Sequence, residues 1–507
     1  MVSKDKILAH KETFATEGRK NLLYDVRNPE SIEAYGKQMI GKTFRQIYQE
    51  YTSKGILKEG QAAYMTRYEK KGRKGGIGNL VEECWFGYTA NSNPEADFPL
   101  AGVELKVTPY TKTSKGLRAK ERLVLGMIDY MEIVRERDLE HSHLWKKIQL
   151  ILLVWYLHIK EQSDMDSTID HVRLFTPPAE DMEIIREDFA KIIRKIKAGQ
   201  AHELSEGDTL YLGACTKSSD ASKRRAQPFS DIDAKPRAFS FKNSYMTYVL
   251  THYILPGKSA YEPAVKPGQQ VSNFERYIMD KISAYRGYSI NQLATQFGIR
   301  TRPKDLSSIL VFRILGVSGN HCEEFEKAGI VIKTIRLQEK GTIRENMSFP
   351  PIKYQALAQE TWEDSTFGNY LRDTRFLFVV YREDGEGEYR LQGGQFWNIP
   401  VKDLDGDVRA VWQETHDIIS GGTLTLRAGK GGTLINNLPK KIDHPISHVR
   451  PHATNRDDTS ELPSGTKLHC GEGVHWTNPM VYTKHCFWLN NDYILSQLCS
   501  ELREPAR

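Results

Sequence analysis

The chain has 507 residues, of which 39% are hydrophobic, 10% aromatic and 27% charged. This composition is typical of folded globular proteins and excludes a largely disordered chain, and the length is sufficient for two to four domains of roughly 100–200 residues each. The 71 lysines and arginines exceed the 65 acidic residues by only six charges. That excess is too small to indicate a polyanionic partner by itself.

Two features bear on the compartment in which the chain works. The longest apolar run, residues 148–159, is shorter than the ~20 residues that span a bilayer, and no apolar segment follows the early lysines. We therefore expect neither a membrane segment nor a signal peptide. The six cysteines include no CxxC pair, which argues against a disulfide scaffold and favours a reducing cytoplasm.

The first half of the chain reads as an α/β domain. Apolar side chains recur at helical spacing in some segments and alternate or run together as in strands in others. A glycine, Gly199, lies just beyond the last predicted helix, where it acts as a stop signal. The predicted elements are helices at 41–51 and 79–87, strands at 103–107 and 148–156, and a helix at 180–197.

The second half repeats the first. A stretch rich in proline and glycine, residues 255–272, separates the halves and is expected to be a linker. Similar segments occur in the same order on both sides, which predicts two tandem copies of one domain, in residues 1–254 and 273–507. The matched pairs are 41–51 with 287–297, 79–87 with 308–316, 98–108 with 325–335, and 239–250 with 487–498.

A short acidic pattern, Asp-x6-Glu-x-Lys, carries the candidate chemistry of the first copy. Because side chains alternate along a strand, Glu104 and Lys106 point the same way, roughly 6–7 Å apart. A turn that contains Pro99 is expected to bring the side chain of Asp97 back beside Glu104 and Lys106. Two carboxylates without cysteine or histidine ligands form a hard oxygen site suited to Mg²⁺. Such an ion stabilises charge on a phosphate and activates water, which Lys106 can orient.

A third carboxylate precedes this strand. Glu82 and Glu83 differ by ~100° around a helix, so only one of them can face the strand. We favour Glu82, because it lies on the face of Ile77 and Gly78. Residues 74–78, which begin with Lys74, are expected to form a flexible basic loop whose backbone can approach phosphates.

The alternative to a catalytic site is a surface strand with an ordinary salt bridge. The second copy argues against it, because that copy keeps the sequence frame and loses the acids. At the positions of Glu82, Asp97, Glu104 and Lys106 the second copy has Val311, Glu324, Val331 and Lys333. A metal site can be lost in this way when only one copy has to cut, whereas a structural salt bridge has no such reason to disappear.

The run KGGIGNLVEECWFG, continued by SNPEADFPLAGVELKVTPY up to residue 110, resembles the MutH family. That family includes a strand-nicking mismatch-repair enzyme and the Sau-type restriction endonuclease, which cuts at GATC. The two-copy length is similar to that of the restriction enzyme. The resemblance implies the PD-(D/E)xK nuclease fold, with a mixed central sheet flanked by helices. It also implies metal-binding and catalytic roles for Asp97, Glu104, Lys106, Glu82 and Lys74, although one extra residue near Glu82 leaves Glu83 open.

The same resemblance suggests residues that contact DNA. Lys74 matches a family active-site lysine, and Lys147 is similar to a family lysine placed near DNA. In the second copy, residues 449–455 resemble the family's DNA-reading Arg-Pro-Lys stretch, with His452 at the lysine position. Arg450 and Asn455 of this stretch are competent to contact base edges.

The first copy departs from that pattern. Residues 213–217 (Gly-Ala-Cys-Thr-Lys) stand where the family has Arg-Pro-Lys. How this copy reads bases is therefore open, and Lys217 and Lys242 are the best candidates for contacts with DNA.

We therefore expect a bacterial cytoplasmic type II restriction endonuclease that uses Mg²⁺ to hydrolyse double-stranded DNA at GATC, a site implied only by the resemblance. The second copy is expected to bind a further DNA site as an effector. We expect a monomer in solution, with a dimer on DNA as the alternative. The rival functions are a strand-nicking repair enzyme, a DNA-binding regulator without activity and, less well supported, a carbohydrate-cleaving enzyme.

Overall fold

The computed structural model describes residues 23–53, 76–89, 95–114, 116–218, 220, 222–255 and 261–504. The chain divides into two compact units, each assembled from separate segments. Unit 1 comprises Met1–Met127, Arg135–Met182 and Phe239–Lys258, and unit 2 comprises Ile128–Val134, Glu183–Ala238 and Ser259–Arg507. Within the described ranges, no helix combines the length and apolar character required to cross a membrane.

Unit 1 is built on a mixed four-stranded sheet in the order β2-β1-β4-β5. Its strands are β1 (Glu104–Thr113), β2 (Gly116–Ala119), β4 (Ile151–Leu157) and β5 (Ile169–Phe175). Strands β1 and β4 are parallel, whereas β2 and β5 run antiparallel to their neighbours. Strand β4 is buried from Ile151 to Tyr156, as expected for a central strand covered on both faces. The strands predicted at 103–107 and 148–156 are thus confirmed.

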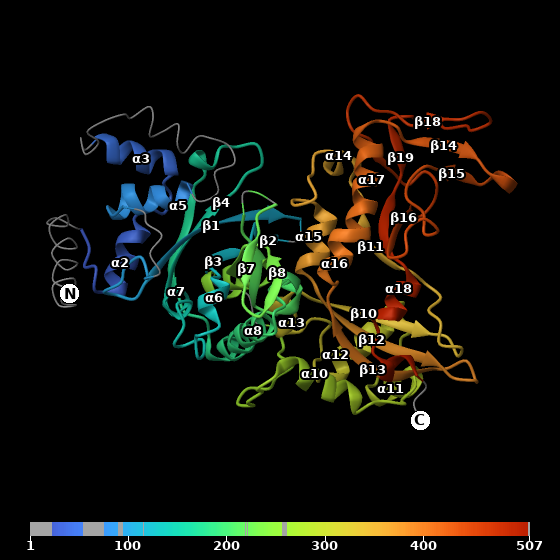
Figure 1. The fold of residues 1–507 in the computed structure, drawn as a ribbon, viewed down its shortest axis with the longest axis horizontal. Coiled ribbons are helices and arrows are strands. Elements are labelled where there is room, and N and C mark those ends of the chain that lie inside the picture. Colours follow the sequence, from blue (N-terminus) through green and yellow to red (C-terminus); the bar gives the residue numbers. More distant parts are fainter. Residues whose placement is uncertain are drawn as a thin grey trace. The chain divides into compact units, whose positions relative to one another are not determined.

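Helices pack beside this sheet (Figure 1). They are α2 (Pro29–Lys37), α3 (Phe44–Ser53), α5 (Gly76–Leu80) and the π-helix η1 (Val81–Phe86). The Asn28 side chain accepts hydrogen bonds from the first backbone amides of α2, which satisfies donors that a helix otherwise leaves free. Phe44 and Ile47 of α3 are buried in one apolar cluster with Leu152 and Val154 of β4. The helices predicted at 41–51 and 79–87 are present, and the second becomes a π-helix at its end.

Unit 2 contains a three-stranded sheet with the order β10-β12-β13. These strands are β10 (Ile330–Leu337), β12 (Arg375–Glu383) and β13 (Tyr389–Trp397). Strands β10 and β12 are parallel and β12 and β13 antiparallel, the same directions as in β1, β4 and β5. In residues 261–329, directly before β10, the structure describes the helices α10 (Phe274–Ser283), α11 (Ile290–Gln296), α12 (Leu306–Ile314) and α13 (Glu323–Ala328).

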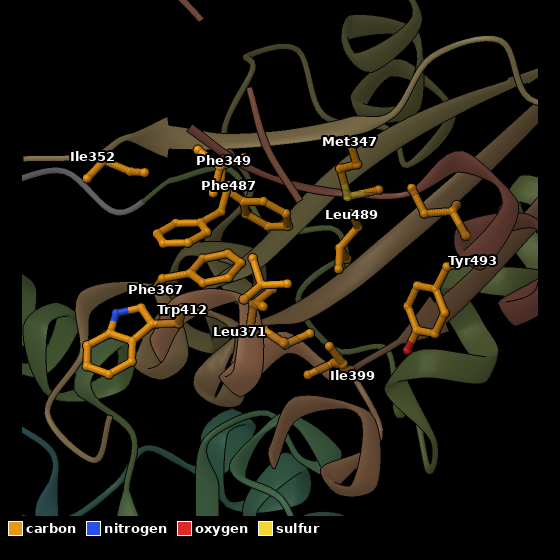
Figure 2. Close-up of a cluster of buried hydrophobic side chains, with 14 of the residues drawn as sticks. Met347, Phe349, Ile352, Phe367, Leu371, Ile399, Trp412, Phe487, Leu489 and Tyr493 are labelled. Carbon is orange, nitrogen blue, oxygen red and sulfur yellow. The ribbon is translucent and has the colours of Figure 1, made fainter. Parts of the chain in front are cut away.

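A second sheet of unit 2 has the order β11-β20-β16. Its strands are β11 (Met347–Pro351), β16 (Ser447–Pro451) and β20 (His485–Leu489), and α15 (Thr366–Asp373) and α17 (Arg409–Ser420) contribute to the same core. Figure 2 shows the rings of Phe367 and Phe487 face to face, with centroids 4.2 Å apart. Stacked rings of this kind join α15 to β20 and stabilise the core beyond simple burial.

The other elements complete the chain order. The helix predicted at 180–197 is α8 (Ala179–Lys197), and Gly199 follows it with a left-handed φ of 70°. Residues 261–272, the described part of the predicted linker, contain no helix or strand. The remaining described elements are β3 (Leu123–Met127), α6 (Tyr130–Ile133), α7 (Trp145–Ile148), η2 (Asp164–Asp166), η3 (Ala201–Glu203), η4 (Glu206–Asp208), β6 (Leu212–Thr216), β7 (Arg225–Gln227), β8 (Ser230–Ala234), β9 (Arg237–Phe241), α9 (Asn243–Tyr248), η5 (Val249–Ile254), α14 (Tyr354–Leu357), α16 (Val401–Asp403), η6 (Leu404–Val408), β14 (Thr425–Ala428), η7 (Lys430–Gly432), β15 (Leu434–Asn436), β17 (Thr459–Glu461), β18 (His469–Cys470), β19 (Val481–Thr483), α18 (Asn491–Gln497) and α19 (Ser500–Arg503).

Candidate active site

The start of β1 presents an acid and a lysine on one face of the unit 1 sheet. Lys106 Nζ lies 2.5 Å from Glu104 Oε1, as the period of two along a strand requires. The intervening Leu105 is buried in the apolar cluster on the opposite face. Glu104 is itself only 2% exposed, so its charge depends on partners within the protein.

A tight turn brings Asp97 back to this strand. Phe98 and Val103 form an isolated antiparallel bridge, and Gly102 between them adopts a left-handed φ of 66°. Asp97 Oδ2 then accepts a hydrogen bond of 2.9 Å from the backbone N–H of Leu105. The carboxylate of Asp97 is thereby fixed beside Glu104.

A second lysine, Lys147 of α7, reaches the carboxylate of Glu104. Lys147 Nζ donates to Glu104 Oε2 at 2.9 Å and to the backbone oxygen of Glu95 at 2.5 Å. Each oxygen of Glu104 therefore has an ammonium partner, Lys106 on Oε1 and Lys147 on Oε2. Charge-assisted hydrogen bonds of this kind offset the cost of burying the acid.

Glu82 provides a third carboxylate from the π-helix η1. Burial, the neighbouring charge of Asp97 and, more weakly, that of Glu104 raise the pKa of Glu82 to about 7, while Lys106 opposes the shift. Its neighbour Glu83 lies near Tyr51, where its charge contributes to a raised pKa of that phenol. The two glutamates thus face different surroundings, and Glu82 is the one near the strand acids.

Asp97, Glu82 and Glu104 place like charges near one another, which favours a nearby cation. Burial and the charge of Glu104 raise the pKa of Asp97 to about 6, because like charges in a poorly hydrated place disfavour ionisation. All the donors are hard oxygens, which suits Mg²⁺. Among the described residues, no three histidine, cysteine or acidic side chains stand at metal-binding distance from a common point. Each oxygen of Glu104 has one ammonium partner, so an ion entering here competes with Lys106 and Lys147 for this carboxylate.

Comparison with known proteins gives the family context. A family model described as "DNA mismatch repair enzyme MutH" matches residues 86–188, a stretch that includes Asp97, Glu104 and Lys106. The chain is 36% identical over 466 residues to the type II restriction enzyme Sau3AI of Staphylococcus aureus, which covers 84% of this chain and 93% of that enzyme. The chain belongs to the MutH/Sau-type restriction endonuclease family. DNA mismatch repair protein MutH of Shigella boydii serotype 18 is 24% identical and covers 46% of this chain and 96% of its own, and that of Shewanella woodyi is 27% identical with 41% and 92% covered.

The π-helix has a role in this MutH/Sau-type nuclease. A π-helical turn takes up one residue more than an α-helical turn, so the π-helix at Val81–Phe86 changes the directions in which Glu82 and Glu83 point. The turn ends at Gly87, which has a left-handed φ of 74° and allows the chain to leave the helix toward Asp97. Within this π-helix, Glu82 lies close enough to Asp97 and Glu104 for their charges to act on it.

One expectation about the neighbouring loop is wrong. Gly76, Ile77 and Gly78 form the first turn of α5 and are not part of a flexible loop, because the apolar residues that follow anchor this segment as a helix. Lys74 and Gly75 lie outside the described residues.

The remaining candidate DNA contacts differ in exposure. Lys217 is exposed, whereas Lys242, at the start of α9, is only 3% exposed, so the latter is not presented to DNA in this arrangement. Arg450 and His452 are exposed, and the Arg450 guanidinium lies 4.8 Å from the centroid of the Trp488 ring. The side-chain oxygen of Asn455 accepts hydrogen bonds from the next backbone amides of its own turn, which leaves its amide nitrogen for other partners.

The residues of unit 2 that the sequence comparison matched to Asp97, Lys106 and Glu82 have structural contacts. Both oxygens of Glu324 accept hydrogen bonds from linker amides, those of Ala264 at 2.9 Å and Val265 at 3.0 Å. Lys333 donates to the backbone oxygen of Ser348, and burial lowers its pKa. Val311 is buried in α12. These positions therefore contain no group of acids.

Sequence reasoning missed two features of the site. The resemblance placed Lys147 near DNA, but the structure also places its ammonium group on Glu104. Tyr88 was not considered at all, although the charges of Asp97 and Glu82 contribute to a raised pKa of its phenol. No periodicity or motif marks Tyr88; its only sequence signal is that it follows the glycine that ends η1.

Proposed function

We propose that this restriction endonuclease hydrolyses phosphodiester bonds of double-stranded DNA at GATC in a Mg²⁺-dependent reaction. The observation that carries the proposal is the group of three carboxylates and two lysines in unit 1, because that combination suits a phosphate and a divalent ion. Sugar cleavage requires only a pair of acids, so the lysines favour a phosphate substrate. The free state of all six cysteines agrees with work in a reducing bacterial cytoplasm.

The acids and the lysines of the site have separate roles. Asp97 and Glu104, with Glu82 beside them, would hold Mg²⁺, which supplies stabilisation of phosphate charge and a lower pKa for the attacking water. Lys106, once released from Glu104, orients that water in line with the phosphorus. Lys147 remains near the scissile phosphate and balances its negative charge.

The length of the match favours a restriction enzyme over a repair nickase. The restriction enzyme of S. aureus matches 84% of this chain, whereas the MutH proteins of S. boydii and S. woodyi match 46% and 41%. The shared strand directions of β1-β4-β5 and β10-β12-β13 support two copies of a PD-(D/E)xK domain. We infer that the second copy, in residues 273–507, binds a further GATC site and acts as an effector of the first.

Purified protein tests this function directly. With Mg²⁺, we expect linear products from a closed plasmid that contains GATC and an intact plasmid when GATC is absent. Cutting of both plasmids would overturn the specificity and keep the nuclease. A product that is only nicked would favour the repair-type alternative, and no cutting of either plasmid would overturn the function.

The roles of Glu82 and Glu83 can be separated with a matched pair of variants. Glu82→Gln removes a charge beside Asp97, so we expect cleavage to fall about a hundredfold. Glu83→Gln, its neighbour on the other side of η1, is expected to stay within about threefold of the parent. Single-turnover rates at saturating DNA measure both variants, and equal losses would show that the assignment is wrong.

The effector role of the second copy gives a different prediction. Arg450→Ala removes an exposed cation from the stretch that resembles the family's DNA-reading segment, and we expect cleavage of two-site DNA to fall about tenfold with little change on one-site DNA. Arg456→Ala is the matched control, because its guanidinium also lies 4.8 Å from a tryptophan centroid, that of Trp476. Equal rates on one-site and two-site DNA for the parent enzyme would contradict the effector role.

A further inference from the structure

Tyr88 is held beside the acids by two contacts, one with Glu82 and one with Phe98, the residue that follows Asp97. Its backbone N–H donates to the backbone oxygen of Glu82 at 3.1 Å. Its ring packs edge-on against Phe98, the residue after Asp97, with centroids 5.3 Å apart. The phenol is thus held from the side of Glu82 and from the side of Asp97.

The hydroxyl of Tyr88 is buried and makes no hydrogen bond to any residue in the described part of the chain. A buried hydroxyl without a partner costs stability, and such groups call for an explanation. A phenol is protonated at neutral pH, so this hydroxyl can act as a donor.

The acids differ in the donors that they receive. Glu104 has both lysines, one on each oxygen. Asp97 uses Oδ2 for the amide of Leu105. A donor on the side of Asp97 and Glu82 would orient these two carboxylates, as hydrogen bonds to metal ligands generally do.

We propose that Tyr88 is a positioning residue of the metal centre, whose hydroxyl donates a hydrogen bond to the Asp97–Glu82 carboxylate pair when a divalent ion draws that pair together. The inference rests on the metal binding of the proposed function and not on its cleavage step. It accounts for the buried hydroxyl that has no partner among the described residues, because the group is unpaired without the ion and paired with it.

Tyr88→Phe in the full chain tests this role without relying on cleavage. Calorimetric titration with Mn²⁺ should show binding weakened about tenfold, while the thermal midpoint of the metal-free variant stays the same or rises because an unpaired hydroxyl has been removed. Tyr24→Phe is the matched control. Its hydroxyl donates to the backbone oxygen of Phe86 at 2.9 Å, so we expect a lower thermal midpoint and unchanged Mn²⁺ affinity.

The outcomes separate the alternatives. Unchanged Mn²⁺ affinity in Tyr88→Phe, or a loss of stability that accompanies weaker binding as in a purely structural role, overturns the proposal. A second measurement is the effect of Tyr88→Phe in a Glu82→Gln background, which should be smaller than in the parent; an equal effect also overturns it. A parent protein that binds Mn²⁺ and does not cut DNA would defeat the proposed function and leave this inference standing.

Discussion

Asp97→Asn is expected to reduce DNA cleavage by at least about 10³-fold, because it removes a charged metal ligand from the centre of the site. The same change should not destabilise the metal-free protein at pH 8. Its carboxylate is buried among other acids, and its raised pKa of about 6 shows that ionisation there is unfavourable. Cleavage of a labelled GATC duplex and thermal unfolding of the same preparation measure the two effects.

A loss of cleavage without a loss of thermal stability distinguishes a functional acid from a structural one. Asp188 provides the contrast, although burial raises its pKa to about 6 as well. Its two carboxylate oxygens accept hydrogen bonds from the backbone amides of Leu210, Tyr211 and Leu212, and asparagine would turn an NH₂ donor toward some of these donors. Asp188→Asn should therefore lower the thermal midpoint. Retained cleavage in Asp97→Asn, or a large loss of its stability, would contradict the assignment of Asp97.

Cleavage at limiting Mg²⁺ is expected to fall about a hundredfold between pH 7.5 and pH 5.5. Metal binding requires ionised carboxylates, and the pKa values of Asp97 and Glu82 are raised to about 6 and about 7. Protons therefore compete with the ion across this range, by up to about tenfold per pH unit for each proton. Saturating Mg²⁺ should move the midpoint of the profile to lower pH.

The same shifts predict the opposite trend for stability without metal. The folded protein binds these protons more tightly than the unfolded chain does, so the contribution of Asp97 and Glu82 to the free energy of unfolding is largest at low pH and falls as pH rises from about 4 to 7. Glu82→Gln should remove the part of this fall that lies near pH 7. A cleavage profile that is flat from pH 5.5 to 7.5 and insensitive to Mg²⁺ would contradict the account.

The sequence predicts the structure best in the strands, where the pattern of apolar and polar residues reports which side chains are buried. The alternation of residues 103–107 predicts that Glu104 and Lys106 share a face, and the structure shows their side chains in contact. The apolar run at residues 148–159 predicts the buried central strand β4. These inferences succeed because a strand with one or two buried faces leaves few alternatives for its register.

Features that depend on contacts distant in sequence were not predictable in the same way. Lys147 reaches Glu104 across 43 positions of sequence, and nothing near Lys147 indicates that partner. The orientation of Glu82 was inferred from α-helical geometry, whereas the segment is a π-helix. Lys242 is buried, because the segment around it packs on the core, and a lysine in the sequence does not report that.

A crystal soaked with Mn²⁺ tests the central claim most directly, because an anomalous difference map locates the ion without reference to activity. We predict a peak within coordination distance of Asp97 and Glu104, with at least one of Lys106 and Lys147 displaced from Glu104, and no peak at Glu324, the residue matched to Asp97. A peak at another place in the chain, with both lysines still bound to Glu104, would contradict the account.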